Sequence, residues 1–143
     1  VPGYVLTVVG RGDLTAFAND RHESIEFVGE VPAIAPYVSG SRVGIAPALS
    51  GSGFRGKVNQ YAVMGVPSVV TSIAIKGLAY RHGKDIFVED SPEDFANRCI
   101  SLLVDTELND RMGAAARRQC VEKYSWESKW PALKRIYGLE GQA

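Results

Sequence analysis

A glycine-rich run at residues 51–57 is the segment of the sequence best suited to bind a ligand. Gly51, Gly53 and Gly56 fall within six residues, and Arg55 and Lys57 add two cationic side chains. Glycine lets the backbone approach a ligand closely, and the first turn of a following helix offers unpaired N–H groups and a positive dipole end. These features favour a bound phosphate or diphosphate. The alternative is a flexible connection that binds nothing.

The same run also has the GxxxxGK spacing of a nucleotide-hydrolysing P-loop. However, Val58 occupies the position of the Ser or Thr that would hold Mg²⁺. The one apolar run followed by an acid that could form the partner strand, residues 102–105, ends a well-capped helical pattern. A P-loop ATPase is therefore a minor alternative. We expect no metal at this site, because Arg55, Lys57 and the helix end can partly neutralise a diphosphate.

A second glycine turn, at residues 10–12, follows the first apolar run. Glu30 lies after the next run, near the offset of an acid that binds ribose, which suggests a dinucleotide site. Thr15 replaces the third glycine of that fingerprint, so a tight strand-to-helix turn is the alternative. Residues 11–13 also spell a cell-adhesion tripeptide, but no secretion leader or disulfide framework supports that function.

The remaining chemistry-bearing side chains form no recognisable catalytic pattern. His22 and His82 lie in polar loops without an orienting partner in sequence, so we expect both at the surface. Cys99 and Cys120 lie in helical patterns without a CxxC motif or a nearby His. We expect small buried side chains there, with a disulfide or a metal site as alternatives.

Short β-branched runs alternate with helical patterns along the first two thirds of the chain. This alternation predicts an α/β protein with a Rossmann-like, doubly wound parallel sheet. The expected strands are residues 4–9, 25–28, 43–47, 67–71 and 85–89, and the expected helices between them are residues 14–21, 33–38 and 55–64. In such a sheet, ligands bind beyond the carboxyl ends of the strands, where both glycine turns lie.

Helical patterns follow the last expected strand. Ser91 and Pro92 form an N-cap and a first helical position, and two further helices are expected at about residues 107–123 and from near Ser125. We expect the tryptophans of the last helix, Trp126 and Trp130, to be packing anchors. The arginines of the preceding helix should form a solvated face; they are Arg111, Arg117 and Arg118.

Composition limits the remaining possibilities. The chain has 143 residues, 45% of them hydrophobic, with 16 Lys+Arg against 16 Asp+Glu and a net charge of zero. This length predicts one domain, and the balanced charge disfavours a general nucleic-acid or anionic-membrane binder. The uncharged stretch 58–75 contains Gly65 and Pro67 and divides into two different patterns, so it is not expected to span a membrane.

Six motifs, taken in order, resemble the carboxyl-terminal, donor-binding domain of GT-B glycosyltransferases, and most closely the family 4 group of retaining enzymes. The resemblance covers nearly the whole chain. The motifs are residues 8–10, residues 25–31, Tyr37 with the strand at 43–47, residues 51–58, residues 64–71 and residues 124–127.

The resemblance implies one half of a GT-B architecture, in a hexosyltransferase that needs no cofactor and acts in glycan, lipid-linked glycan or polysaccharide biosynthesis. A nucleotide-sugar donor would lie across the carboxyl edge of the sheet, with its ribose at Gln60. Residues implied for the base are Gly29, Glu30 and Val31; those implied for the sugar and diphosphate are Ser52, Gly53, Phe54, Arg55, Gly56 and Lys57.

The sequence departs from the family pattern in two ways. The family's paired glutamates fall at Ser52 and Gln60, and the family's first strand, with an Arg and Lys that clamp the diphosphate, has no counterpart before Val1. We therefore expect residues 1–143 to be one donor-binding domain, inactive alone, that works with an amino-terminal acceptor domain. Membrane association would occur only through that other half, and the expected location is cytoplasmic. The alternatives are a degenerate domain used for binding or assembly, and a nucleotide-sugar epimerase.

Overall fold

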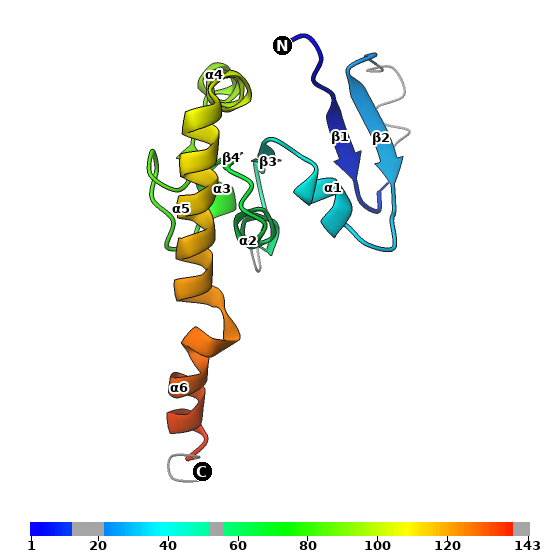
Figure 1. The fold of residues 1–143 in the computed structure, drawn as a ribbon. Helices are drawn as coiled ribbons and strands as arrows, with labels where there is room; N and C mark the ends of the chain where they lie inside the picture. Colours follow the sequence, from blue (N-terminus) through cyan, green and yellow to red (C-terminus); the bar gives the residue numbers. More distant parts are fainter. Residues whose placement is uncertain (13–21, 52–55, 139–143) are drawn as a thin grey trace.

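The computed structural model describes residues 1–12, 22–51 and 56–138 of the chain (Figure 1). The strands are β1 (Leu6–Val9), β2 (Ile25–Gly29), β3 (Gly44–Ala46), β4 (Ser68–Val70) and β5 (Phe87–Val88). The helices are α1 (Ala35–Ser39), α2 (Gly56–Val63), α3 (Ser72–Ile75), α4 (Pro92–Val104), α5 (Thr106–Tyr124) and α6 (Trp126–Ile136). All five predicted strands are present. The short helix α3 was not predicted, and the helix expected at 14–21 falls outside the described residues.

All pairings between these strands are parallel, as predicted, but the strands form two sheets. β1 pairs with β2 from Leu6 opposite Ile25, with a bulge after Val8, and β3, β4 and β5 form a second sheet in that order. Figure 1 shows the β1–β2 pair standing apart from the three-stranded sheet, with α1 between them in the chain. In the described residues the parallel strands are therefore present in two separate sheets.

Helices cover both faces of the three-stranded sheet. On one face, Val70 of β4 packs in a cluster with Val58 and Ala62 of α2. On the other face, Val69 packs with Leu102 of α4 and Met112 of α5. Successive side chains of a strand point to opposite faces, so adjacent valines on β4 fill two separate cores. This is the two-sided burial typical of a parallel sheet in an α/β protein.

Polar side chains begin the last three helices. The Ser91 hydroxyl accepts a hydrogen bond from the Asp94 N–H ahead of α4, where Pro92 is the first helical residue, as predicted. Asp105 caps α5 in the same way through the Leu108 N–H, and Ser125 caps α6. Each cap satisfies a backbone donor that the helix cannot pair internally. The helices therefore begin where the sequence supplies an oxygen acceptor.

The carboxyl-terminal helix corrects one prediction. Trp126 is 77% exposed and Trp130 is 50% exposed, and α6 has no buried residue. The two tryptophans are therefore not packing anchors within the described chain. The arginines of α5 are exposed, as expected, and no helix in the described parts of the chain is long and apolar enough to cross a membrane.

Candidate functional site

A hollow of about 420 Å³ lies at the carboxyl end of β3. Residues 46–48, residues 56–58 and Ala74 line it, so its walls come from the end of one strand and the beginnings of α2 and α3. Of the predicted diphosphate ligands, the structure places Gly56 and Lys57 here. Ser52, Gly53, Phe54 and Arg55 lie outside the described residues.

Helix α2 presents its polar side chains beside this hollow because its apolar side chains face the core. Val58 and Ala62, four residues apart, are 1% and 2% exposed and pack against the sheet. Lys57 and Gln60, three residues apart, are both exposed and share another side of the helix. The first N–H groups of a helix generally have no partner within that helix, and the helix dipole favours an anion near them. The arrangement can therefore hold a phosphate-bearing group against α2.

The carboxyl ends of β1 and β2 are joined by an ion pair. The Arg11 guanidinium donates to both oxygens of the Glu30 carboxylate, at 2.6 and 3.0 Å, and both side chains are exposed. This hydrogen bonding raises the pKa of Arg11. Glu30 was predicted from the sequence as a ligand, whereas its pairing with Arg11 was not predicted. The sequence shows that Arg11 and Glu30 each follow an expected strand, but only the structure shows that these two strands pair with each other.

Gly29 ends β2 with a φ of +83°. This left-handed conformation suits glycine, because a Cβ would be strained there. The backbone can thus turn sharply from the strand into Glu30 and Val31, the other two residues expected to face a base. Gly29 and Val31 are half-buried, whereas Glu30 is exposed.

Polar residues that the sequence analysis did not select brace the ends of β4 and β5. The Thr71 hydroxyl donates to the Ala48 carbonyl at 2.6 Å and caps α3 by accepting from the Ala74 N–H. The Ser72 N–H donates to the Asp90 carboxylate at 2.8 Å, and this bond lowers the pKa of Asp90. Because Ala48 and Ala74 line the hollow, the Thr71 hydroxyl fixes two of its walls relative to each other. Thr71 and Asp90 could have been found because Thr71 ends one predicted strand and Asp90 follows another.

The histidines and cysteines do not assemble into a site. His22 and His82 are exposed, as expected; His82 accepts a hydrogen bond from the Val88 N–H. Both cysteines are free thiols. Cys99 on α4 is half-buried, and Cys120 on α5 is buried. Across the described ranges, no group of three or more His, Cys, Asp or Glu side chains could hold a metal ion.

A comparison with protein-family models matches residues 2–105 to "Glycosyl transferases group 1". The match extends from before β1 to just past α4 and therefore includes every strand and the hollow at α2. The chain belongs to the glycosyl transferases group 1. No curated protein matches this glycosyl transferase chain.

Solved structures share the fold of this glycosyl transferase chain at low sequence identity. Anabaena Alr3699/HepE in complex with UDP has a TM-score of 0.80 at 13% identity, with 96% of this chain and 42% of that chain covered. A glycosyltransferase from Rickettsia africae ESF-5 has a TM-score of 0.76 at 17% identity, with 96% and 41% covered. The chain thus spans about two fifths of the length of these proteins. The predicted α/β, Rossmann-like half of a GT-B architecture is confirmed.

Proposed function

We propose that this chain is the nucleotide-sugar donor-binding domain of a glycosyltransferase. The observation that carries the proposal is the hollow at the carboxyl end of β3, which meets the first turn of α2 and the exposed Lys57. Ligands of doubly wound sheets bind beyond the carboxyl ends of the strands. In support, Alr3699/HepE, which shares this fold, was crystallised with UDP and also with UDP and glucose.

The diphosphate of the donor would lie against the beginning of α2. Lys57 and the α2 N–H groups would meet its oxygens, together with Ser52, Gly53, Phe54, Arg55 and Gly56 of the preceding loop. In the reaction, the bond from the anomeric carbon to the diphosphate oxygen breaks and a bond to an acceptor hydroxyl oxygen forms. The diphosphate leaves with the electron pair, and the acceptor hydroxyl loses its proton. Cationic groups and a helix end stabilise the charge that develops on the leaving group.

The nucleoside would extend from the beginning of α2 across the carboxyl edge of the sheet. Gln60 shares a side of α2 with Lys57, so its amide can donate to and accept from the ribose hydroxyls. The base would lie against Gly29, Glu30 and Val31, where the Arg11–Glu30 ion pair holds the carboxyl end of β2 to β1. Arg11 would thus position the loop that receives the base.

The full reaction would need a second half that binds the acceptor. We propose a carboxyl-terminal position for this chain in a cytoplasmic hexosyltransferase of glycan, lipid-linked glycan or polysaccharide biosynthesis. The exposed Trp126 and Trp130 of α6 are suited to contact that amino-terminal half. The active enzyme would then be the two-domain protein, with no cofactor beyond the donor itself.

Replacing Lys57 by Ala should weaken nucleotide binding about tenfold. Loss of one hydrogen bond to a charged group costs about 1.5 kcal/mol, which corresponds to roughly a tenfold increase in Kd. The measurement is an NMR titration of the chain with UDP, GDP and ADP, which also identifies the preferred base. Shifts should be concentrated at residues 29–31 and 51–60.

The control for this titration is Lys123→Ala, which removes an exposed lysine from the last turn of α5. Its Kd should equal that of the unchanged chain. Equal affinities for the Lys57→Ala and Lys123→Ala variants would remove Lys57 from the site.

A degenerate domain that binds or assembles without catalysis is the second candidate. It is favoured by the amide of Gln60, where the family resemblance implies a carboxylate. If the chain has a working donor site adapted to glutamine, the Gln60→Glu variant should bind the nucleotide with a Kd within about threefold of that of the unchanged chain, or more weakly.

A gain of about fivefold or more in the Gln60→Glu variant would instead favour the degenerate domain. A charge-assisted bond to ribose is worth about 1 kcal/mol more than a neutral one, which corresponds to that gain. Asn97→Asp, which adds the same charge at an exposed position of α4, controls for a general charge effect.

A further inference from the structure

Helix α2 is held on both flanks of the face that packs against the sheet. Successive residues of an α-helix lie about 100° apart around its axis. Asn59 therefore lies on one flank of the buried Val58 face and Tyr61 on the other, and both side chains are half-buried. Lys57 and Gln60 lie on the remaining, exposed side of the helix. The direction in which these two polar side chains point thus depends on what holds the two flanks.

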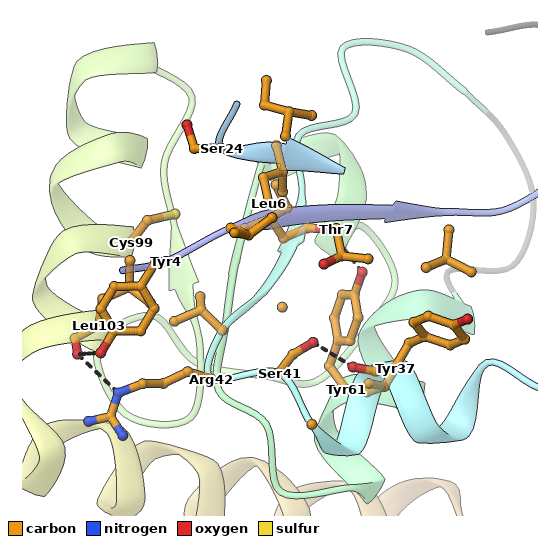
Figure 2. A pocket seen from close by; sticks show the side chains of 18 of the residues that line it. Tyr4, Leu6, Thr7, Ser24, Tyr37, Ser41, Arg42, Tyr61, Cys99 and Leu103 are labelled. Atoms are coloured by element: carbon orange, nitrogen blue, oxygen red, sulfur yellow. Dashed lines mark hydrogen bonds between the residues drawn. The ribbon is translucent and has the colours of Figure 1, made fainter. Parts of the chain in front are cut away.

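The Tyr61 flank of α2 is fixed to β3. The Tyr61 hydroxyl donates to the Ile45 carbonyl at 3.1 Å. The tyrosine lines the larger cavity of the described chain, of about 700 Å³ (Figure 2). Its ring also covers Gly44, where an added Cβ would lie 2.5 Å from the ring. Tyr61 therefore ties one flank of α2 to the strand whose carboxyl end borders the hollow.

The Asn59 flank is fixed to the connection between α3 and β5. Tyr80 lies in this connection and is 8% exposed, and its hydroxyl donates to the Asn59 Oδ1 at 2.8 Å. The Cys120 thiol of α5 donates to the Asn59 carbonyl at 3.7 Å. Burial raises the pKa of Tyr80, so the hydroxyl keeps its proton and remains a hydrogen-bond donor. The second flank of α2 is thus held by a buried hydroxyl group.

Tyr80 is itself held in place by the last turns of α5. The Ala79 N–H donates to the Tyr124 hydroxyl at 2.5 Å, and the Gln119 side-chain amide donates to the Ala79 carbonyl at 2.6 Å. The ring centroids of Tyr80 and Tyr124 lie 5.8 Å apart. Hydrogen bonds to both polar groups of Ala79 restrict the backbone immediately before Tyr80. The Tyr80 hydroxyl is therefore well placed to hold α2 in one orientation.

We propose that Tyr80 is a positioning residue of the donor site, which fixes the rotation of α2 about its axis through Asn59 and so directs Lys57 and Gln60 towards the nucleotide. This inference rests on the proposed donor site. Side chains extend about 5–6 Å from a helix axis, so a rotation of about 20° would move the ends of Lys57 and Gln60 by roughly 2 Å. Displacements of about 1 Å already weaken directed polar contacts.

A purely structural role for the same hydrogen bond predicts a different result. Loss of the bond would then lower the free energy of unfolding and leave the Kd of the folded chain for a nucleotide unchanged. A positioning role predicts a weaker Kd even where the variant is fully folded. The two roles are therefore separated by measuring affinity at a temperature at which circular dichroism shows each variant to be folded.

The test is an NMR titration of the Tyr80→Phe variant, which loses only the hydroxyl group. The nucleotide is UDP, GDP or ADP, whichever the unchanged chain binds most tightly. Its Kd should rise at least about threefold, because Lys57 and Gln60 are no longer held in one direction. The matched control is Tyr4→Phe, which removes a tyrosine hydroxyl that donates to the Leu103 carbonyl and not to α2. Its Kd should equal that of the unchanged chain.

A second variant removes the other partner of the hydrogen bond. Asn59→Ala leaves Tyr80 in place and should weaken binding by a factor similar to that of Tyr80→Phe. The double variant should bind no more weakly than either single variant, because both substitutions remove the same interaction. Asn59→Ala also provides the answer if Tyr80→Phe does not fold.

A measurement without ligand separates this inference from the proposed function. In both single variants, the amide peaks of Lys57 and Gln60 should shift or broaden, because α2 changes its orientation or exchanges between orientations. The same peaks should be unchanged in Tyr4→Phe. If the unchanged chain binds none of the three nucleotides, the proposed function fails, whereas these peaks still decide whether Tyr80 orients α2.

Each outcome decides the proposal. Weaker binding in both single variants, with no further loss in the double variant, supports it. A Kd change smaller than about threefold in Tyr80→Phe, an equal change in Tyr4→Phe, or additive losses in the double variant overturn it. Unchanged amide peaks of Lys57 and Gln60 in the ligand-free variants overturn it as well.

Discussion

Replacing Gly113 by Ala should lower the free energy of unfolding by about 3 kcal/mol. A Cβ on Gly113 would lie 2.1 Å from the Gly65 carbonyl oxygen and 3.3 Å from Pro67. The first contact is with backbone, which cannot rotate away as a side chain can, so α5 or the turn before β4 must shift. Overpacking of this kind costs about 1–3 kcal/mol or more. Urea denaturation followed by circular dichroism measures the change.

Helix propensity alone predicts the opposite sign for this substitution, because alanine is favoured over glycine by about 1 kcal/mol inside a helix. Ala114→Gly, at the adjacent exposed position of α5, calibrates that propensity and should cost about 1 kcal/mol. An unchanged or higher stability of the Gly113→Ala variant would show that the contact with Gly65 is not tight.

Asn109→Asp should destabilise the protein by about 3 kcal/mol at neutral pH. Asn109 is 7% exposed, and its amide nitrogen donates to the carbonyls of Arg42 and Leu102, each at 2.9 Å. The substitution keeps the size but places a carboxylate oxygen against two carbonyl oxygens. Leaving buried polar groups unpaired costs about 1–3 kcal/mol, and more when a charge is involved.

The destabilisation caused by Asn109→Asp should also depend on pH. A protonated carboxyl group can donate one hydrogen bond, so the stability deficit should shrink as the pH falls and the introduced carboxyl group becomes protonated. Denaturation of the variant and of the unchanged chain at several pH values gives the difference. Asn97→Asp on the exposed side of α4 should stay within about 0.5 kcal/mol. Equal losses at both positions would contradict the role given to Asn109.

The sequence predicted the elements well where the signals were local. The β-branched runs located all five strands, and Ser91 with Pro92 marked the start of α4 as the structure has it. Residue type and position alone supply these signals, because a cap or an N1 proline acts within one helical turn. The short helix α3 was missed, although Thr71 caps it, because four residues carry too little periodicity to be recognised.

The candidate site was predictable in part. The glycine-rich run and Lys57 could be selected because backbone freedom and charge are properties of single residues, and the structure brings Gly56 and Lys57 to the end of β3. The Arg11–Glu30 ion pair and the hydrogen bond from Thr71 to Ala48 could not be predicted directly from the sequence. Each joins the ends of two strands, and the sequence does not state which strands are neighbours.

The sequence by itself determined the element types, the caps and the cationic glycine-rich turn. Only the tertiary structure decided that β1 and β2 stand apart from β3, β4 and β5, that Gly113 meets the Gly65 carbonyl, and that Trp126 is exposed. The physical reason is one of range. Propensities and caps depend on neighbours within a few residues, whereas sheet edges, close backbone contacts and burial depend on segments that are brought together only when the whole chain packs.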